Sequence, residues 1–245
     1  MVLDRSSGGH LCMPGTTSIL CTMPHIGSAL ARFPRFLLDQ AAWLEVLAAT
    51  GLLMSYIWWW QGSFTGDFLI CLGLFLAISI TGHRRRGESA RDLGFRLDNF
   101  GQSARWVFSF VGPLILLMTV IGLALGLHRE LPVPGLLARV ILMPLFGVAQ
   151  EYGLLGFYYR RFQEALPGVW APILASAAVF AALHAPNTPV MVMTLAISIG
   201  ACWLYRKASN LWVLGLAHGL LSITTAMFLA KLLILGLKIG SRALR

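Results

Sequence analysis

A single carboxylate lies inside an apolar run that ends in two arginines, in the stretch Gln150-Glu151-Tyr152-Gly153-Leu154-Leu155-Gly156-Phe157-Tyr158-Tyr159-Arg160-Arg161. Glu151 precedes Arg161 by ten residues, which corresponds to about 15 Å along a helix. A carboxylate at that depth in hydrocarbon costs at least a few kcal/mol, and membrane proteins keep such groups where they serve a function. The stretch therefore predicts a membrane helix that carries a functional glutamate.

The composition is that of a membrane protein. Of the 245 residues, 57% are hydrophobic and 12% are charged, whereas a soluble globular chain carries about 25% charged residues. The net charge of +9 is compatible with a nucleic-acid partner, but the arginines lie between apolar runs, where they set the orientation in the membrane. We therefore expect contact with a lipid bilayer and no nucleic-acid partner.

Seven apolar stretches predict an all-α, polytopic transmembrane helix bundle with seven or eight spans. They cover residues 41–60, 67–82, 105–127, 135–159, 169–185, 189–205 and 211–237. Each is near the roughly 20 residues that cross a bilayer, and the last is long enough to break into a span and a second short helix. Residues 1–36, rich in Ser, Gly, Thr and Pro, predict a mobile N-terminal tail. Residues 37–245 then form a single transmembrane domain.

Basic residues concentrate in every second connection between the apolar stretches. The connections after the second, fourth and sixth stretches are basic, whereas 61–66 and 128–134 contain only Arg129. Because positive loops stay in the cytoplasm, we expect a multi-pass protein of the cell inner (plasma) membrane with a cytoplasmic N terminus. The basic C-terminal tail favours an even number of spans; its basic residues are Lys238, Arg242 and Arg245.

Other charged residues near the span ends have ordinary explanations. Glu45 is near the start of the first stretch, where its side chain can reach the interface. Arg160 and Arg161 follow the fourth stretch and are expected to anchor it at the cytoplasmic face.

Two histidines share the apolar surroundings of Glu151. His218 follows Lys207 by eleven residues, or about 16 Å of helix, and His184 lies about 21 Å from Trp170 on the same measure. These depths are comparable, so Glu151, His184 and His218 are predicted to share a cavity. A carboxylate in a low-dielectric pocket is a strong base that suits water activation, and imidazoles can orient the water or stabilise an oxyanion. Alternatively, the same three side chains could ligate zinc with water in the fourth position; the residues leave both readings open.

The sequence lacks the signatures of other intramembrane proteases. No HExxH helix motif of a metalloprotease is present. Neither GxGD nor a pair of membrane aspartates supports an aspartyl protease, and no GxSG marks a serine nucleophile. Glu151 is therefore the one credible base.

These residues resemble the motifs of the CPBP family, the CAAX prenyl endopeptidase and bacteriocin-processing type of intramembrane protease. Gln150–Phe157 aligns with the family's EExxxR motif, Phe180–His184 fits FxxxH, and His218–Ser222 fits a variant of HxxxN. The motif-bearing core spans about 135–225. The resemblance implies a membrane endopeptidase with His184 and His218 at the family's histidine motifs, and with the family's water-activating glutamate aligned at Gln150. With Glu151 as the base, the predicted catalytic residues are Glu151, His184 and His218.

Three positions depart from the family pattern. Gln150 stands at the first glutamate, Leu155 replaces the arginine, and Ser222 replaces the asparagine. Either Glu151 has become the base, or the alignment slips by one residue, or proteolysis has been lost. Gln150 and Ser222 can still hold a water or a substrate carbonyl by hydrogen bonds. Arg160 or Arg161 could supply the charge of the missing arginine.

The sequence thus predicts an intramembrane endopeptidase that hydrolyses a peptide bond near the membrane end of a protein or peptide substrate. By the resemblance, the substrate could be a C-terminal anchor or sorting signal, as in divergent bacterial branches of the family. We expect no cofactor, with zinc held by Glu151, His184 and His218 as the alternative. The competing prediction is a non-catalytic protein of the same fold that acts in bacteriocin immunity or as a scaffold for a membrane partner.

Overall fold

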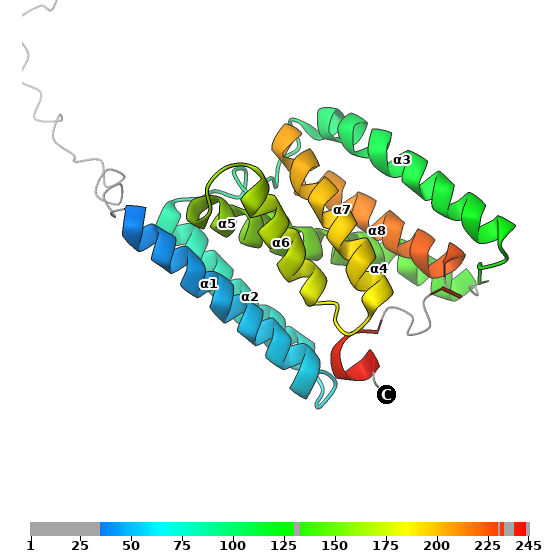
Figure 1. Cartoon of the computed structure of the whole chain (residues 1–245), viewed down its shortest axis with the longest axis horizontal. Helices are drawn as coiled ribbons and strands as arrows, with labels where there is room; N and C mark the ends of the chain where they lie inside the picture. The colour runs from blue at the N-terminus through cyan, green and yellow to red at the C-terminus, as the bar shows by residue number, and fades with distance from the viewer. Residues whose placement is uncertain (1–34, 130–132, 230, 233–237, 244–245) are drawn as a thin grey trace, which may run out of the picture. The chain divides into compact units, whose positions relative to one another are not determined.

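The computed structural model describes residues 35–129, 133–229, 231–232 and 238–243. Phe33–Arg245 forms one compact unit, and its described part consists of helices joined by short connections (Figure 1). The predicted all-α polytopic bundle is confirmed. The predicted mobile tail, residues 1–36, lies outside the described residues except for its last two, and it stays a prediction.

The described helices follow the predicted apolar stretches. Six of them are long and apolar enough to cross a membrane, and Trp170–Ala182 is a shorter apolar helix. In chain order the elements are α1 (Arg35–Ser55), η3 (Tyr56–Trp60), α2 (Asp67–Arg86), α3 (Phe100–Ala124), α4 (Val133–Glu151), η4 (Tyr152–Tyr159), α5 (Arg160–Ala165), α6 (Trp170–Ala182), α7 (Thr188–Lys207), α8 (Leu211–Phe228) and η5 (Gly240–Ala243).

Two predicted spans differ from the helices observed. The stretch 169–185 forms only the 13 residues of α6, about 20 Å of helix, which is short of the roughly 30 Å of hydrocarbon. A turn that contains Pro186 separates α6 from α7. The stretch 211–237 is helical as far as Phe228. The eighth helix considered for its far half falls largely on residues 230 and 233–237, which lie outside the described residues.

Three connections meet at one end of the bundle, which we call the basic end (residues 83–99, 160–161 and 206–210). The hydroxyl of Tyr205 donates to the Leu93 carbonyl at 2.9 Å, and the Leu211 amide donates to the Gly94 carbonyl at 2.9 Å. The Arg160 guanidinium donates to the Asp92 carbonyl at 3.1 Å. These bonds join the connection before α3 to α5, α7 and α8.

The other end of the bundle, which we call the opposite end, is organised around the turn between α6 and α7. The Gly240 amide donates to the Ala185 carbonyl at 2.7 Å, and the Asn187 side chain donates to the Lys238 carbonyl at 3.0 Å. A Cβ at Gly240 would collide with the Ile57 carbonyl, so η5 also packs closely on η3. These contacts bind the last described segment, residues 238–243, beside α6 and α7 (Figure 1).

The closest helix pair is α4 with α8, and glycines make this approach possible. Gly215 and Gly219 are four residues apart on α8, the small-xxx-small spacing that lets membrane helices approach closely. A Cβ at Gly219 would lie 2.6 Å from the Pro144 nitrogen, and one at Gly215 would collide with Val148. On α4, a Cβ at Gly147 would collide with the Gly215 carbonyl. The two backbones therefore touch just before Glu151 and around His218.

Candidate active site

Glu151 is the last residue of α4, and a π-helical segment, η4, follows it directly. Its side chain is buried, with the residue 3% exposed. π-helical segments are rare overall, and those that occur are often found at functional sites. Their i→i+5 hydrogen bonds locally change which residues share a helix face. η4 contacts α6, α7 and α8, so the segment after Glu151 lies among the elements that carry the two histidines.

Glu151 forms a close pair with His218 of α8. Its Oε1 lies 2.7 Å from His218 Nδ1. Among the residues that the structure describes, Oε2 has no hydrogen-bond partner although it is buried. A buried carboxylate oxygen without a partner is costly, and it marks the place where a water or a substrate group would bind.

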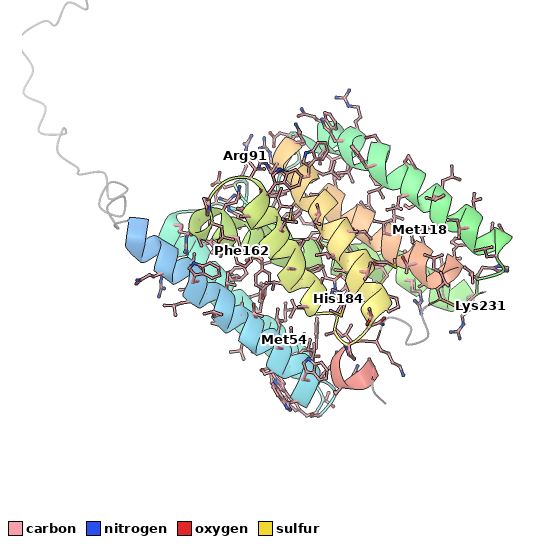
Figure 2. All side chains as sticks on the ribbon, in the orientation of Figure 1. Met54, Arg91, Met118, Phe162, His184 and Lys231 are labelled. Atoms are coloured by element: carbon pink, nitrogen blue, oxygen red, sulfur yellow. The ribbon has the colours of Figure 1, made fainter. Side chains whose placement is uncertain are left out.

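His184 lies in the turn after α6 (Figure 2). Its Nδ1 lies 2.7 Å from the Phe180 carbonyl. The Phe180 ring meets the His184 ring edge-on at a centroid distance of 5.2 Å and the His218 ring at 6.5 Å. The four-residue spacing of FxxxH thus lets Phe180 fix one histidine and contact the other.

All five predicted site residues line one pocket of about 520 Å³, which we call the polar pocket; they are Gln150, Glu151, His184, His218 and Ser222. The structure therefore brings together residues from α4, the turn after α6 and α8 that are far apart in the sequence. Gln150 is half-buried and reaches the same pocket as Glu151. The roles predicted for these five residues stay predictions, since geometry alone assigns no reaction step.

A second pocket, the apolar pocket, adjoins the same pair of residues. It has a volume of about 470 Å³ and lies among α3, α7 and α8. Glu151 and His218 line both pockets, and the remaining lining is apolar, for example Phe110 and Met118. The carboxylate–imidazole pair therefore stands where a polar space meets an apolar one, as a site for a peptide with an apolar segment would require.

The hydrogen bonds define what each imidazole can offer. A carbonyl only accepts, so His184 Nδ1 carries the proton and neutral His184 presents Nε2 as an acceptor. An ionised Glu151 likewise requires that His218 Nδ1 donate to it. Each neutral ring can then take a proton from water, whereas donors to an oxyanion are the Gln150 amide, the Ser222 hydroxyl or a protonated histidine.

The zinc reading lacks support from the arrangement of ligands. In the part of the chain that the structure describes, no group of three or more His, Cys, Asp or Glu side chains is placed to hold a metal ion. We therefore derive no step through a metal.

The interpretation of the charges at the basic end as simple interfacial anchors is wrong. Arg161 is fully buried at 0% exposure, and Glu45 is 8% exposed. Arg161 Nη1 lies 2.6 Å from Glu164, and its Nε lies 3.4 Å from Glu45, an ion-pair distance without hydrogen-bond geometry. Arg161 also pairs with Glu88. The sequence did not reveal this cluster because its members come from three separate segments, α1, the connection after α2 and α5, that only the fold brings together.

The cluster extends along α2 toward the residue after Glu151. Arg86 binds Glu45 at 2.8 Å and Glu164 at 2.7 Å. His83 Nδ1 lies 2.7 Å from Glu88, and His83 Nε2 lies 3.1 Å from the hydroxyl of Tyr152. Burial acts to raise the pKa of Glu88, but the hydrogen bond with His83 and the charges of Arg161 and Arg160 outweigh it and lower the pKa to about 2. These connected side chains hold η4 and α5 against α1 and α2. We call them the basic-end cluster: Glu45, His83, Arg86, Glu88, Tyr152, Arg160, Arg161 and Glu164.

A comparison with protein-family models matches one family. Residues 130–224 match the model described as type II CAAX prenyl endopeptidase Rce1-like. The matched segment contains α4, η4, α6, α7 and most of α8, and hence every residue of the polar pocket that the sequence singled out. No curated protein and no solved structure matches the chain.

Proposed function

Because the match over residues 130–224 places the chain in the CPBP family of membrane proteases, we propose that it is an intramembrane endopeptidase with Glu151 as the water-activating base. The observation that carries the proposal is the divided role of the Glu151 carboxylate. Oε1 is held by His218 at 2.7 Å, the buried Oε2 has no hydrogen-bond partner among the described residues, and Glu151 lines both pockets. A fixed, available carboxylate oxygen is what a general base needs.

In the proposed reaction, Oε2 of Glu151 takes a proton from a water molecule whose oxygen attacks the peptide carbonyl carbon. His218 orients Glu151 through the Nδ1 contact, and the Gln150 amide or the Ser222 hydroxyl donates to the oxyanion. The C–N bond then breaks and Glu151 returns the proton to the leaving nitrogen, which gives a carboxylic acid and an amine. The step assigned to His184 is to hold the water through Nε2. The proposal uses no cofactor.

The proposed substrate is a membrane-embedded protein or peptide that is cut near the membrane end of an apolar segment. The apolar pocket would accept part of that segment, and the polar pocket would accept the bond to be cut. A helix hides its carbonyls, so the substrate must be unwound at that bond. A C-terminal anchor or sorting signal would satisfy these requirements. We further propose the plasma membrane, with the N terminus and the basic end in the cytoplasm, because arginines concentrate there.

One observation favours the competing proposal of a non-catalytic scaffold. Gln150 reaches the polar pocket at the position where the family has its first glutamate, and an amide cannot act as a base. In that case the contact between Glu151 and His218 would be structural. The two proposals differ in what they predict for an isosteric change at Glu151.

The test is proteolysis of a labelled single-span peptide by the full chain in lipid nanodiscs. Glu151→Gln keeps an oxygen that can accept from His218 but removes the base, so we expect cleavage to fall by 10² to 10⁴-fold with the thermal midpoint nearly unchanged. Gln150→Ala is the matched control and should lose less cleavage activity than Glu151→Gln. Equal cleavage by wild type and Glu151→Gln would refute Glu151 as the base. No cleavage by wild type across a set of apolar peptides would support the scaffold instead.

A further inference from the structure

Two cationic side chains line the polar pocket, and neither has a role in the proposed reaction. They are Lys238 and Arg242, from the last described segment of the chain, and Gln61 lines the pocket with them. All three belong to the opposite end, away from the arginine-rich connections. Glu151 is the one acidic residue in this lining, and it is buried against His218.

The segment that carries the two cations is fixed to the rest of the bundle. Its backbone is held at two points, by the bond from the Gly240 amide to Ala185 and by the bond from the Asn187 side chain to the Lys238 carbonyl. Gly240 has a positive φ of 58°, which suits its close approach to η3. The cations are therefore presented to the pocket by an ordered turn that rests on the helices holding His184.

The two cations differ in how available their charge is. The Arg242 guanidinium lies against Gly62, and the Gly62 amide donates to the Asp67 carboxylate, so an acid lies in the neighbourhood of Arg242. Lys238 is exposed, and its ammonium group forms no ion pair with an acidic side chain of the described residues. Lys238 thus supplies most of the uncompensated positive charge at this end of the pocket.

We propose that Lys238 and Arg242 bind a carboxylate of the substrate, with Arg242 secondary, so that a negatively charged group marks the substrate at the opposite end of the bundle. This inference rests on the proposed function for its substrate but concerns recognition rather than the reaction step. An Asp or Glu side chain next to the apolar segment and the α-carboxylate of a chain end share the required chemistry. If the basic end is cytoplasmic, the recognised group lies on the non-cytoplasmic side of the membrane.

The geometry gives the substrate a direction. The cations line the polar pocket and are absent from the described lining of the apolar pocket, which extends among α3, α7 and α8. Glu151 and His218 line both. A substrate that places its apolar segment in one pocket and its carboxylate in the other therefore presents the intervening peptide bonds to Glu151.

Binding is measured on the Glu151→Gln background, in which cleavage is absent by design, so that recognition is tested apart from proteolysis. The probe is a fluorescein-labelled peptide with one Asp beside a leucine-rich segment, and the protein is in phosphatidylcholine nanodiscs. Two sister peptides distinguish the carboxylate sources: one has Asn in place of Asp with a free C terminus, and one has Asp with an amidated C terminus. Fluorescence anisotropy gives the Kd of each.

A hydrogen bond to a charged group contributes about 1.5–3 kcal/mol, so Lys238→Glu should weaken binding of the recognised peptide by at least about tenfold. Lys238→Glu should leave the Kd of the peptide that lacks the recognised carboxylate unchanged. Arg242→Gln should also weaken binding of the recognised peptide, by a smaller factor. The matched control is Lys231→Glu, a lysine whose Nζ donates to the Gly126 carbonyl outside the polar pocket (Figure 2).

The result that overturns the proposal is a Kd for the first peptide, which carries both carboxylates, that is the same in Lys238→Glu and Lys231→Glu. That result would not bear on Glu151. Conversely, loss of cleavage in Glu151→Gln with the charge preference intact would leave both proposals standing, and charge-dependent binding without cleavage by wild type would support recognition by a non-catalytic scaffold.

Discussion

Replacing Arg161 with Met should destabilise the bundle without touching either pocket. Arg161 is fully buried and lies between three carboxylates, those of Glu45, Glu88 and Glu164. Methionine keeps much of the volume and removes the charge. The carboxylates of Glu45 and Glu88, each with a side chain 9% exposed, and the partly exposed Glu164 would then lose a shared cation in surroundings where an unpaired charge is expensive.

The expected size follows from what remains after the change. Removing one partner from a buried ion pair costs about 3–5 kcal/mol. Here each carboxylate keeps a second cation, because Arg86 still binds Glu45 and Glu164, and Arg160 binds Glu88 at 2.5 Å. We therefore expect the low end of that range, about 3 kcal/mol, or roughly a hundredfold in the folding equilibrium.

The measurement is equilibrium unfolding in mixed detergent micelles by titration with SDS, followed by fluorescence of the eight tryptophans. The matched control is Arg91→Met, which removes an arginine whose partner Asp98 lies 3.0 Å away on the surface, with side chains 68% and 45% exposed (Figure 2). Such a pair contributes about 1 kcal/mol at most. Equal midpoints for Arg161→Met and Arg91→Met would show that the basic-end cluster does not hold η4 and α5 in place.

Two further predictions use the same protein in micelles. The pKa of Glu88 in the folded protein is about 2 against an ordinary 4.5, so the contribution of Glu88 to stability is complete above pH 4.5 and is lost as the pH falls toward 2. In Glu88→Gln the dependence of stability on pH should flatten in this window. An unchanged dependence would contradict the role given to Glu88. Gly215→Ala should cost about 1–3 kcal/mol by overpacking α8 against Val148 and should also reduce cleavage, whereas Gly112→Ala, with open space around it, should do neither. Chemical denaturation and the peptide cleavage assay check both variants, and equal effects of the two would rule out a special α4–α8 contact.

Hydropathy predicted the helices well because each span must bury its backbone polar groups within itself and expose apolar side chains to lipid. It failed at the stretch 169–185, where apolar composition was sufficient but the turn around Pro186 ends the helix early. It also failed for Arg161 and Glu45. A charge near a span end looks the same in the sequence whether it faces water or another charge, and only the packing of α1, α2 and α5 decides between them.

Among the site residues, the motifs predicted which side chains share a pocket but left open whether Gln150 or Glu151 faces the histidines. The close contact of α4 and α8 at Gly147 and Gly215 decides between them, and the sequence did not predict this contact. Gly147 touches α8, and a residue four positions on lies on the same helix face; that residue is Glu151. On α8, His218 is three residues after Gly215, on the face that touches α4. Gln150 is offset by about 100° around α4, so it reaches the pocket but not His218. The close approach of the two helices thus brings Glu151, which stands one place after the family position, to His218, and this register is the physical reason for proposing Glu151 as the base.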